Sequence, residues 1–287
     1  MTKSAQLRKY LDRAIKEKFA IPAINTTNME TTQSIVEAAK ELKAPVILQI
    51  TESAIKYAGF EYIESILKIA DSHPNVFVHL DHGTTLEMAK RCIESPAFSS
   101  VMIDKSKTAF EENVNATKEI KEYAGYKLVE AELGIVGGKE EDIVAHGSIY
   151  TQPEEAKQFI DNTKVDILAI AIGTAHGVYK DEPKLNYEII GEIRALVGDI
   201  PLVLHGSSGL SDEQLRKSVE AGINKVNLDT EIKQAYISGF MNYLGENPAD
   251  YDLRKIFGNA RLTAKEAIKD KIRVLGAENK AEGTLWF

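Results

Sequence analysis

The sequence contains a single cysteine, Cys92, among its 287 residues. One cysteine cannot form an internal disulfide, so the small secreted scaffolds that depend on disulfides are excluded. Apolar runs are also short. The longest uninterrupted run covers Ile167 to Ile172, whereas a membrane-spanning helix needs about 20 such residues. The segment Met1 to Lys9 carries charge and lacks the apolar stretch of a signal peptide. We therefore expect a cytoplasmic protein with no membrane partner.

Positive charge is also in deficit. The sequence has 35 Lys and Arg residues against 43 Asp and Glu residues, a net charge of −8. Nucleic-acid binding needs a cationic surface, so we expect no nucleic-acid partner, and an anionic substrate must be held by local donors. The 8 prolines and 19 glycines are scattered, and no linker or low-complexity stretch interrupts the chain. We expect one domain over residues 1–287.

Eight short segments rich in Val, Ile and Leu have the composition of strands buried on both faces of a parallel sheet. They cover Ala20–Ile24, Val46–Ile50, Val76–Leu80, Ser100–Ile103, Leu128–Leu133, Ile167–Ile172, Leu202–Leu204 and Lys225–Leu228. Helix-period stretches lie between them, such as Thr31 to Leu42 and the segment that opens at Ser211 and closes at Gly222. This alternation predicts a (β/α)8 TIM barrel, with extra helices at Ser4–Lys16 and Pro248–Leu275.

Polar residues stand at or just after the ends of the predicted strands, where the active sites of such barrels are built. They are Asn25, Thr51, Asp81, His82, Asp104, Glu130, Glu132, His176, His205, Asn227, Asp229 and Thr230. Three of the six histidines, His82, His176 and His205, follow different strands. Three protein ligands with an open position describe a catalytic metal site, most often zinc, although a lone histidine is more often structural. Glu132 is either a further ligand or a member of an ion pair, and Asp81 is either a general acid–base group or a partner of a ligating histidine.

Two loops and an insertion indicate how substrate is held. His205–Gly209 and Asn227–Thr230 carry small and hydroxyl residues at the loops where barrels bind phosphate, and Lys180 could add positive charge. Gly134–Gly138 opens a long insertion, in which adjacent glycines resist a fixed structure and so predict a mobile loop. Glu140 on this loop is either a solvated charge or a carboxylate that closes over the substrate. A metal, a phosphate site and two carboxylates together favour reversible aldol cleavage of a phosphorylated ketose.

Five motifs carry a resemblance that runs from about Leu7 to Gly276. They are His79–Gly83, Val129–Gly134 with Gly137–Asp142, Gly173–Tyr179, Val203–Gly209 and Lys225–Thr230. The chain resembles the class II, metal-dependent ketose-bisphosphate aldolases, in the short-chain branch with the fructose- and tagatose-1,6-bisphosphate enzymes. The resemblance implies cleavage of fructose 1,6-bisphosphate to dihydroxyacetone phosphate and glyceraldehyde 3-phosphate. Gly83 favours the fructose substrate, whereas Ala171–His176 is closer to the tagatose enzymes, which remain the alternative.

The resemblance also implies roles for individual residues. His82, His176 and His205 would bind one Zn²⁺ per chain with Glu132 nearby, Asp81 would handle the C4 hydroxyl proton, Glu140 would move the carbon-bound proton, and Asn227 would stabilise the enediolate. The ketone-side phosphate, with Na⁺ or K⁺ beside it, would be bound by Gly177, Lys180, Gly206, Ser208, Asp229 and Thr230. Asn25 and Thr51 complete the predicted substrate-binding rim. Arg254 and Arg261 are candidates for the second phosphate, a role sometimes filled from a partner subunit, and we expect a homodimer or homotetramer.

Three rival functions leave specific residues unexplained. A Schiff-base aldolase needs a lysine in the barrel core, and the predicted strand within Asp166–Gly173 has none. A metal-dependent hydrolase would leave the phosphate site and Glu140 without a role. A catalytically inactive barrel would be expected to lack Asp81 or one of the three histidines, and all are present.

Overall fold

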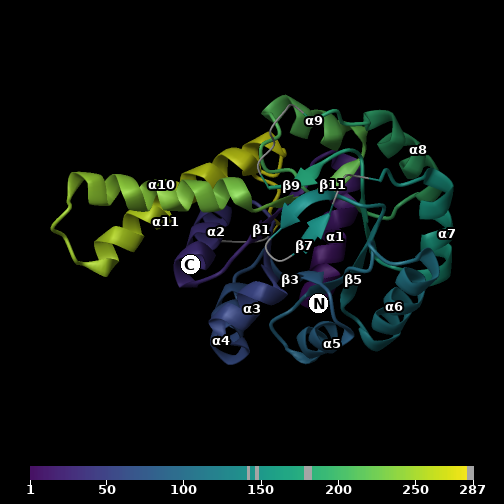
Figure 1. Ribbon diagram of the computed structural model, residues 1–287, viewed down its shortest axis with the longest axis horizontal. Helices are drawn as coiled ribbons and strands as arrows, with labels where there is room; N and C mark the ends of the chain where they lie inside the picture. The colour runs from purple at the N-terminus through teal and green to yellow at the C-terminus, as the bar shows by residue number, and fades with distance from the viewer. Residues whose placement is uncertain (141–142, 146–148, 178–182, 283–287) are drawn as a thin grey trace.

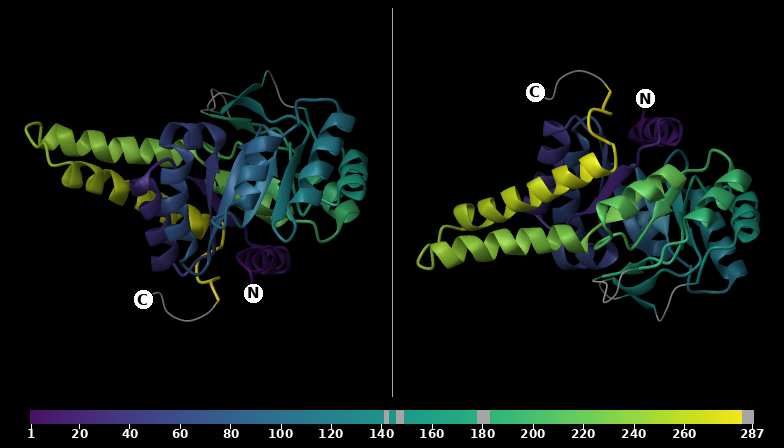
Figure 2. Two further views of the ribbon diagram at one scale, coloured as in Figure 1. Left: turned by 90° about the horizontal axis from the view of Figure 1, so that it is seen from below. Right: turned by 90° about the horizontal axis from the view of Figure 1, so that it is seen from above.

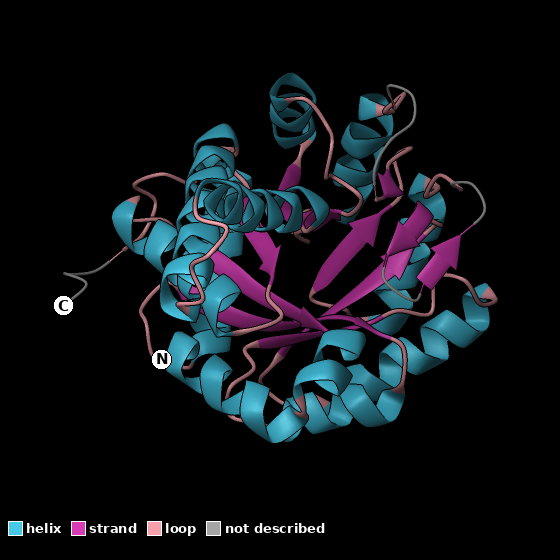
Figure 3. Cartoon of the chain, turned by 60° about the vertical axis from the view of Figure 1, so that its left-hand side comes forward, coloured by secondary structure: helices cyan, strands magenta, loops and turns pink. Residues whose placement is uncertain are grey.

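Eight parallel strands close into a barrel, which Figure 3 shows with the helices around it. The computed structural model describes residues 1–140, 143–145, 149–177 and 183–282. Around the barrel the strands are β1 (Ile21–Asn25), β11 (Ile223–Leu228), β10 (Leu202–Leu204), β8 (Ile167–Ile170), β5 (Leu128–Leu133), β4 (Ser100–Ile103), β3 (Val76–Gly83) and β2 (Val46–Thr51). Each strand coincides with one of the eight predicted segments to within a few residues, so the predicted barrel is confirmed.

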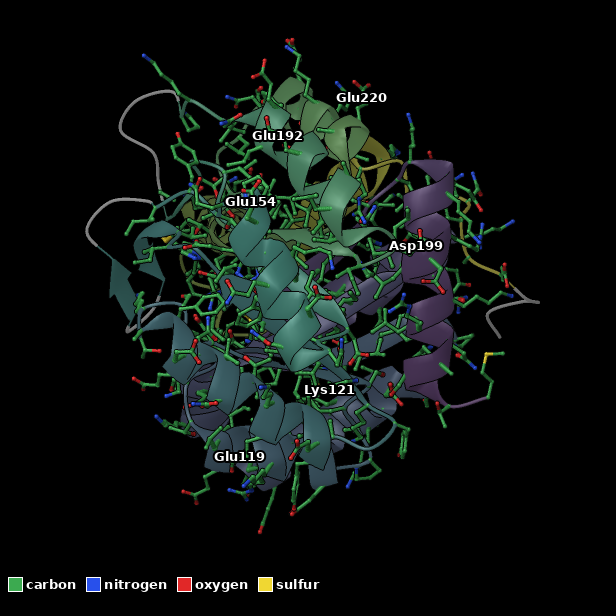
Figure 4. All side chains as sticks on the ribbon, turned by 90° about the vertical axis from the view of Figure 1, so that its right-hand side faces the viewer. Glu119, Lys121, Glu154, Glu192, Asp199 and Glu220 are labelled. Carbon is green, nitrogen blue, oxygen red and sulfur yellow. The ribbon has the colours of Figure 1, made fainter. Side chains whose placement is uncertain are left out.

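Helices follow the strands and cover the outside of the barrel (Figure 1). Their apolar faces pack against the strands, with Ile35, Ile120 and Phe159 fully buried in the same core as the barrel residues. Their outer faces carry exposed carboxylates such as Glu119 and Glu192 (Figure 4). These helices are α2 (Met29–Glu41), α3 (Glu52–Ala58), α4 (Phe60–Asp71), α5 (Leu86–Glu94), α6 (Phe110–Tyr123), α7 (Pro153–Thr163), α8 (Tyr187–Val197) and α9 (Asp212–Ala221).

Local sequence signals set several helix ends. Ser211 and Gln214 form a capping box at the start of α9, and Gly222 closes that helix, as predicted. Asn28 and Thr31 form a second capping box, which starts α2 two residues earlier than the predicted Thr31. Among the described residues, none of the helices has the length and hydropathy that a bilayer crossing requires.

The N-terminal helix α1 (Lys3–Glu17) closes the end of the barrel opposite the predicted site. Lys3 Nζ donates to the carbonyl of Val76 at 3.0 Å, and Ser4 Oγ donates to the carbonyl of Ser99 at 2.7 Å. Both carbonyls lie where a strand begins, at Val76 of β3 and just before β4. Ligands therefore have access from the other, carboxyl end of the strands.

The C-terminal helices α10 (Thr230–Glu246) and α11 (Leu253–Val274) form a two-helix arm that extends beyond the barrel (Figures 1 and 2). The predicted segment Pro248–Leu275 contains α11, and α10 is the helix that the predicted (β/α)8 pattern requires after its eighth strand. The base of the arm is attached to α2, where Lys265 Nζ lies 2.7 Å from Glu41 Oε1. The arm matters for function because α10 begins at the rim of the barrel.

The insertion after β5 has regular structure at Gly137 and Gly138, so the expectation that these glycines resist a fixed structure is wrong. Strand β6 (Gly137–Glu140) pairs with β7 (Ile143–Ala145) and with β9 (Ala175–His176) in a small sheet above the barrel. Gly138 pairs with His176 and has a φ of +86°, and a Cβ there would lie 2.2 Å from the His176 carbonyl oxygen. Glycine thus permits the close pairing rather than preventing order.

Candidate active site

His82, His176 and His205 converge at the carboxyl end of the barrel. They come from the end of β3, from β9 and from the residue after β10, and each offers one ring nitrogen within 4.8 Å of the others. His82 Nε2 and His205 Nδ1 are 2.9 Å apart. The predicted grouping of three histidines is therefore present in the fold.

The second ring nitrogens of two histidines are held by carboxylates. Asp104 Oδ2 lies 2.8 Å from His82 Nδ1, and Glu130 Oε1 lies 3.0 Å from His205 Nε2. Each carboxylate accepts a hydrogen bond from the ring N–H that faces it, which leaves His82 Nε2 and His205 Nδ1 as lone-pair donors directed toward each other. Two such donors at this distance are brought together favourably by a proton or a metal ion between them. This donor set therefore fits a divalent metal ion.

The electrostatics of these groups follow from burial and pairing. Burial alone would raise the pKa of Asp104, but hydrogen bonds from His82 and Ser106 outweigh it and hold the pKa well below its usual range. Burial lowers the pKa of His205 and favours its neutral, metal-binding form, although a hydrogen bond to Glu130 opposes the shift.

Glu132 lies next to the histidines. Its Oε2 atom is 3.5 Å from His205 Nδ1, and it forms a second candidate metal-binding group with His82 and Asp104. Its backbone carbonyl accepts a hydrogen bond from Asn113 Nδ2 at 2.8 Å, which ties the end of β5 to α6. Glu132 therefore lies beside the histidines, and its role at a metal stays a prediction.

Asp81 is fully buried beside the histidines and is held by three amide side chains. Asn25 Nδ2 and Gln49 Nε2 donate to Oδ2 at 2.9 and 3.1 Å, and Asn227 Nδ2 donates to Oδ1 at 3.0 Å. Asn227 Nδ2 also lies 3.3 Å from His205 Nε2, so it spans the carboxylate and the histidines. Neutral amide donors thus fix the orientation of Asp81.

Gln49 is a site residue that the sequence analysis missed. It also donates to Asn25 Oδ1 at 2.6 Å, so Asn25 orients Asp81 through a shared amide network rather than lying alone on the rim. The available signal was a single polar residue inside the otherwise apolar segment Val46–Ile50.

The end of β3 is bent where it presents its two functional residues. His82 has a φ of +45°, and the register of β3 with β4 shifts between Leu80 and Gly83. From this bend Asp81 contacts Asn227, whereas His82 contacts Asp104. Gly83 lies against β4, where an added Cβ would be 2.3 Å from the Met102 carbonyl oxygen.

Gly83→Ala is expected to reduce the free energy of unfolding by about 1–3 kcal/mol, because β3 or β4 must move to admit the methyl group. Gly191→Ala is the matched control, since nothing lies within 4 Å of an added Cβ on this exposed helix residue. It should raise stability by up to about 1 kcal/mol. Urea unfolding measures both, and equal stability of the two variants would contradict the tight contact at Gly83.

A cavity of about 630 Å³ opens beside His176 and Asn227. Its lining includes five of the predicted phosphate-site residues, namely Gly177, Gly206, Ser208, Asp229 and Thr230. Helix α10 begins at Thr230, so its unpaired backbone N–H groups and positive dipole end lie at the cavity. These donors suit an oxyanion in a protein whose net charge is negative.

Lys233 is a cation in this cavity that the sequence analysis did not select. It lies one turn into α10, lines the cavity and has its Nζ 2.9 Å from Asp229 Oδ2. The spacing could have indicated it, because residues four apart, such as Asp229 and Lys233, lie on the same face of a helix.

Other predicted residues lie elsewhere. Thr51 caps helix α3 by accepting from the Ala54 N–H at 3.3 Å. The Arg254 side chain is 91% exposed on the arm and pairs with Asp252, while Arg261 donates to Gln33 at 2.8 Å. None of these three lines the 630 Å³ cavity. Lys180 and the side chain of Glu140 lie outside the described residues, although the backbone of Glu140 ends β6.

The barrel core does contain a lysine, on a strand other than the one searched in the sequence. Lys225 of β11 is fully buried, and its Nζ lies 2.7 Å from Glu130 Oε2. Burial would raise the pKa of Glu130, but Lys225 and His79 outweigh it and hold the pKa well below its usual range. Lys225 does not line the cavity, and an ion-paired ammonium is no nucleophile.

Borohydride added with substrate is therefore expected to leave the enzyme active and to form no covalent adduct. Intact-mass and peptide mass spectrometry check the result, with a Schiff-base aldolase treated in parallel as the positive control. A substrate-derived mass on Lys225, or on any other lysine, would show that the core lysine reacts.

Comparisons with known proteins agree with this geometry. The family model described as fructose-bisphosphate aldolase class-II matches residues 5–280. A fructose-bisphosphate aldolase of Geobacillus stearothermophilus is 42% identical over 96% of this chain and 98% of its own length. One from Staphylococcus aureus is 41% identical over the same shares of the two chains.

Solved structures with the same fold also carry aldolase names. The YdjI aldolase of Escherichia coli K12 superposes with a TM-score of 0.85 at 33% identity, covering 96% of this chain and 98% of that one. The fructose-bisphosphate aldolase of Campylobacter jejuni has a TM-score of 0.78 at 26% identity, covering 98% and 96%. The family model and the curated relatives span nearly the whole chain, and the chain therefore belongs to the class-II fructose-bisphosphate aldolase family.

Proposed function

We propose that this protein catalyses the reversible aldol cleavage of fructose 1,6-bisphosphate to dihydroxyacetone phosphate and glyceraldehyde 3-phosphate. The observation that carries the proposal is the juxtaposition of Asp81, fixed by three amides, with three histidines whose ring nitrogens converge. The named substrate of the curated relatives supports the choice of fructose 1,6-bisphosphate. Tagatose 1,6-bisphosphate is the alternative that the sequence analysis left open.

His82, His176 and His205 would hold the metal, which we propose is one Zn²⁺ per chain. When bound, the ion would polarise the substrate carbonyl and stabilise negative charge that develops on its oxygen. Asp104 and Glu130 orient two of the ligands, since each accepts a hydrogen bond from the ring nitrogen that faces away from the metal.

Asp81 would exchange the proton of the C4 hydroxyl as the C3–C4 bond breaks or forms. Its carboxylate is anchored by neutral amide donors on both oxygens, so it keeps its orientation while it accepts and returns a proton. Asn227 would donate a hydrogen bond to the oxygen on which charge develops, from its place between Asp81 and His205. Glu140 would move the proton on the dihydroxyacetone phosphate carbon, a role supported by its place in β6, which pairs with the strand of His176.

The cavity at the start of α10 would bind the ketone-side phosphate through Gly177, Gly206, Ser208, Asp229 and Thr230, with Lys180 as a further candidate. A monovalent cation, Na⁺ or K⁺, beside that phosphate stays a prediction from the resemblance. Asn25 acts on substrate through Asp81, and Thr51 stays a predicted rim residue.

We also propose a homodimer or homotetramer in which an arginine of the arm serves a neighbouring subunit. Arg254 and Arg261 do not line the cavity of their own chain, and the arm exposes apolar side chains, with Ile237 57% and Met241 61% exposed. Analytical ultracentrifugation tests the assembly.

A cytoplasmic location and a single domain over residues 1–287 complete the proposal, and the buried, unpaired Cys92 agrees with a reducing compartment.

The decisive experiment is a coupled cleavage assay on fructose and tagatose 1,6-bisphosphate, with and without a chelator. We expect the higher kcat/KM on the fructose substrate and no cleavage of either after metal removal. A preference for tagatose 1,6-bisphosphate would favour the alternative, and no cleavage of either by zinc-loaded protein would overturn the proposal.

A further inference from the structure

We propose that Glu130 and Lys225 are positioning residues for His205: Glu130 accepts a hydrogen bond from the Nε2–H of the imidazole, and Lys225 holds the Glu130 carboxylate in place, so that Nδ1 is left as the metal-binding nitrogen. This inference deepens the proposed function and rests on its metal site. It assigns a role to a buried ion pair that neither the phosphate cavity nor the proton transfers use.

The geometry forms a continuous chain of contacts. Lys225 Nζ lies 2.7 Å from Glu130 Oε2, and Glu130 Oε1 lies 3.0 Å from His205 Nε2. His79 approaches the same carboxylate, with its Nε2 3.5 Å from Oε2, and its Nδ1 is 2.8 Å from Ser100 Oγ. Each carboxylate oxygen of Glu130 therefore has its own hydrogen-bond partner, Lys225 on Oε2 and His205 on Oε1, and the carboxylate cannot rotate without losing one of them.

These residues occupy one layer of the barrel interior beneath the rim. His79, Glu130 and Lys225 each precede a rim residue by two positions, namely Asp81, Glu132 and Asn227. Side chains two apart on a strand point to the same face, so the lower layer supports the upper one. All three lower residues are fully buried.

A purely structural role does not account for a salt bridge at this place. Barrel interiors are commonly filled by branched aliphatic side chains, and burying an ion pair costs desolvation energy that an apolar pair avoids. What an apolar pair cannot do is accept a hydrogen bond from His205. Without that acceptor the imidazole is free to take either tautomer and to rotate, and metal affinity typically falls 10–100-fold when such an outer partner is lost.

The test uses the full-length double variant Glu130→Leu with Lys225→Met, which removes both charges together and leaves neither one buried alone. Zinc affinity is measured by competition with a chromophoric chelator, and folding by thermal unfolding of the metal-stripped protein. We expect a folded variant with zinc affinity about 10–100-fold weaker than wild type. Lys127→Met is the matched control, because Lys127 is buried and donates to the backbone carbonyls of Cys92 and Ser95, neither of which belongs to the histidine cluster. Its zinc affinity should equal that of wild type.

A second readout does not depend on the double variant. NMR of the wild-type chain labelled with ¹⁵N-histidine reports the tautomer of His205, assigned by comparison with His205→Gln. We expect the Nε2–H tautomer both in metal-stripped and in zinc-loaded protein. An Nδ1–H tautomer in the metal-stripped protein, or a folded double variant with unchanged zinc affinity, would overturn the positioning role.

The outcomes separate this inference from the proposed function. Wild-type protein that binds no zinc at the histidines would refute the metal site itself. Wild-type protein that binds zinc and cleaves substrate, alongside a double variant of equal affinity, would refute only the role of Glu130 and Lys225.

Discussion

Asp81→Ala is expected to reduce aldol cleavage by about 10²–10⁴-fold, the contribution that a positioned acid or base typically makes. The carboxylate is held by Asn25, Gln49 and Asn227, and its removal leaves the three histidines in place. Steady-state cleavage rates, together with zinc content by elemental analysis, measure the effect. We expect zinc content to equal that of wild type.

The control separates loss of chemistry from loss of stability. Asp71→Ala removes another partly buried carboxylate, which contacts Ser99 at the far end of the barrel, and should leave kcat unchanged. Proton exchange on bound dihydroxyacetone phosphate adds a second test, because Asp81 acts on the hydroxyl and Glu140 on the carbon. Asp81→Ala should therefore retain exchange, and Glu140→Ala should slow it. Normal exchange in Glu140→Ala with lost exchange in Asp81→Ala would show that the two roles are reversed.

The sequence was sufficient to place residues at the rim because strand ends share one edge of a parallel barrel. Asp81, His82, His205 and Asn227 each follow an apolar run, so their convergence required only that the eight strands close in order. The two ends of α9, at Ser211 and Gly222, could also be predicted from the sequence, because local hydrogen bonds set the ends of a helix.

Interior contacts could not be predicted in the same way. Lys225 and Glu130 lie 95 residues apart, on β11 and β5, which are not neighbouring strands. Their contact depends on which side chains point inward in one layer and on how far each reaches across the barrel. The sequence analysis considered only the strand within Asp166–Gly173 for a core lysine, and Lys225 lies on a different strand.

Arg254 and Arg261 illustrate a different limit. Their place depends on the angle at which α10 leaves the barrel, and the length of an apolar-periodic segment does not determine that angle. The arm carries Arg254 away from the cavity of its own chain, although the helix that begins the arm lines that cavity.

Removal of the metal is expected to abolish cleavage and to lower thermal stability. His82 Nε2 and His205 Nδ1 are 2.9 Å apart with their other nitrogens directed to carboxylates, an arrangement that a divalent cation bound between them would stabilise. Purified protein should contain close to one zinc per chain. At a free zinc concentration 1,000 times the Kd, binding should stabilise the folded state by about 4 kcal/mol.

Two histidine variants make this prediction specific. His176→Ala removes one of the three converging ligands and should lose most of the bound zinc and nearly all cleavage activity. His73→Ala removes a partly exposed histidine that belongs to neither candidate metal group among the described residues, so zinc content and kcat should stay at wild-type levels. Elemental analysis and the coupled assay are run on the same preparations, before and after chelation and after zinc is restored. Activity that survives with no metal detected, or zinc retained in full by His176→Ala, would contradict a catalytic ion held by the three histidines. Recovery of activity on adding zinc to the chelated wild type, but not to His176→Ala, is the result that the convergence of these side chains requires.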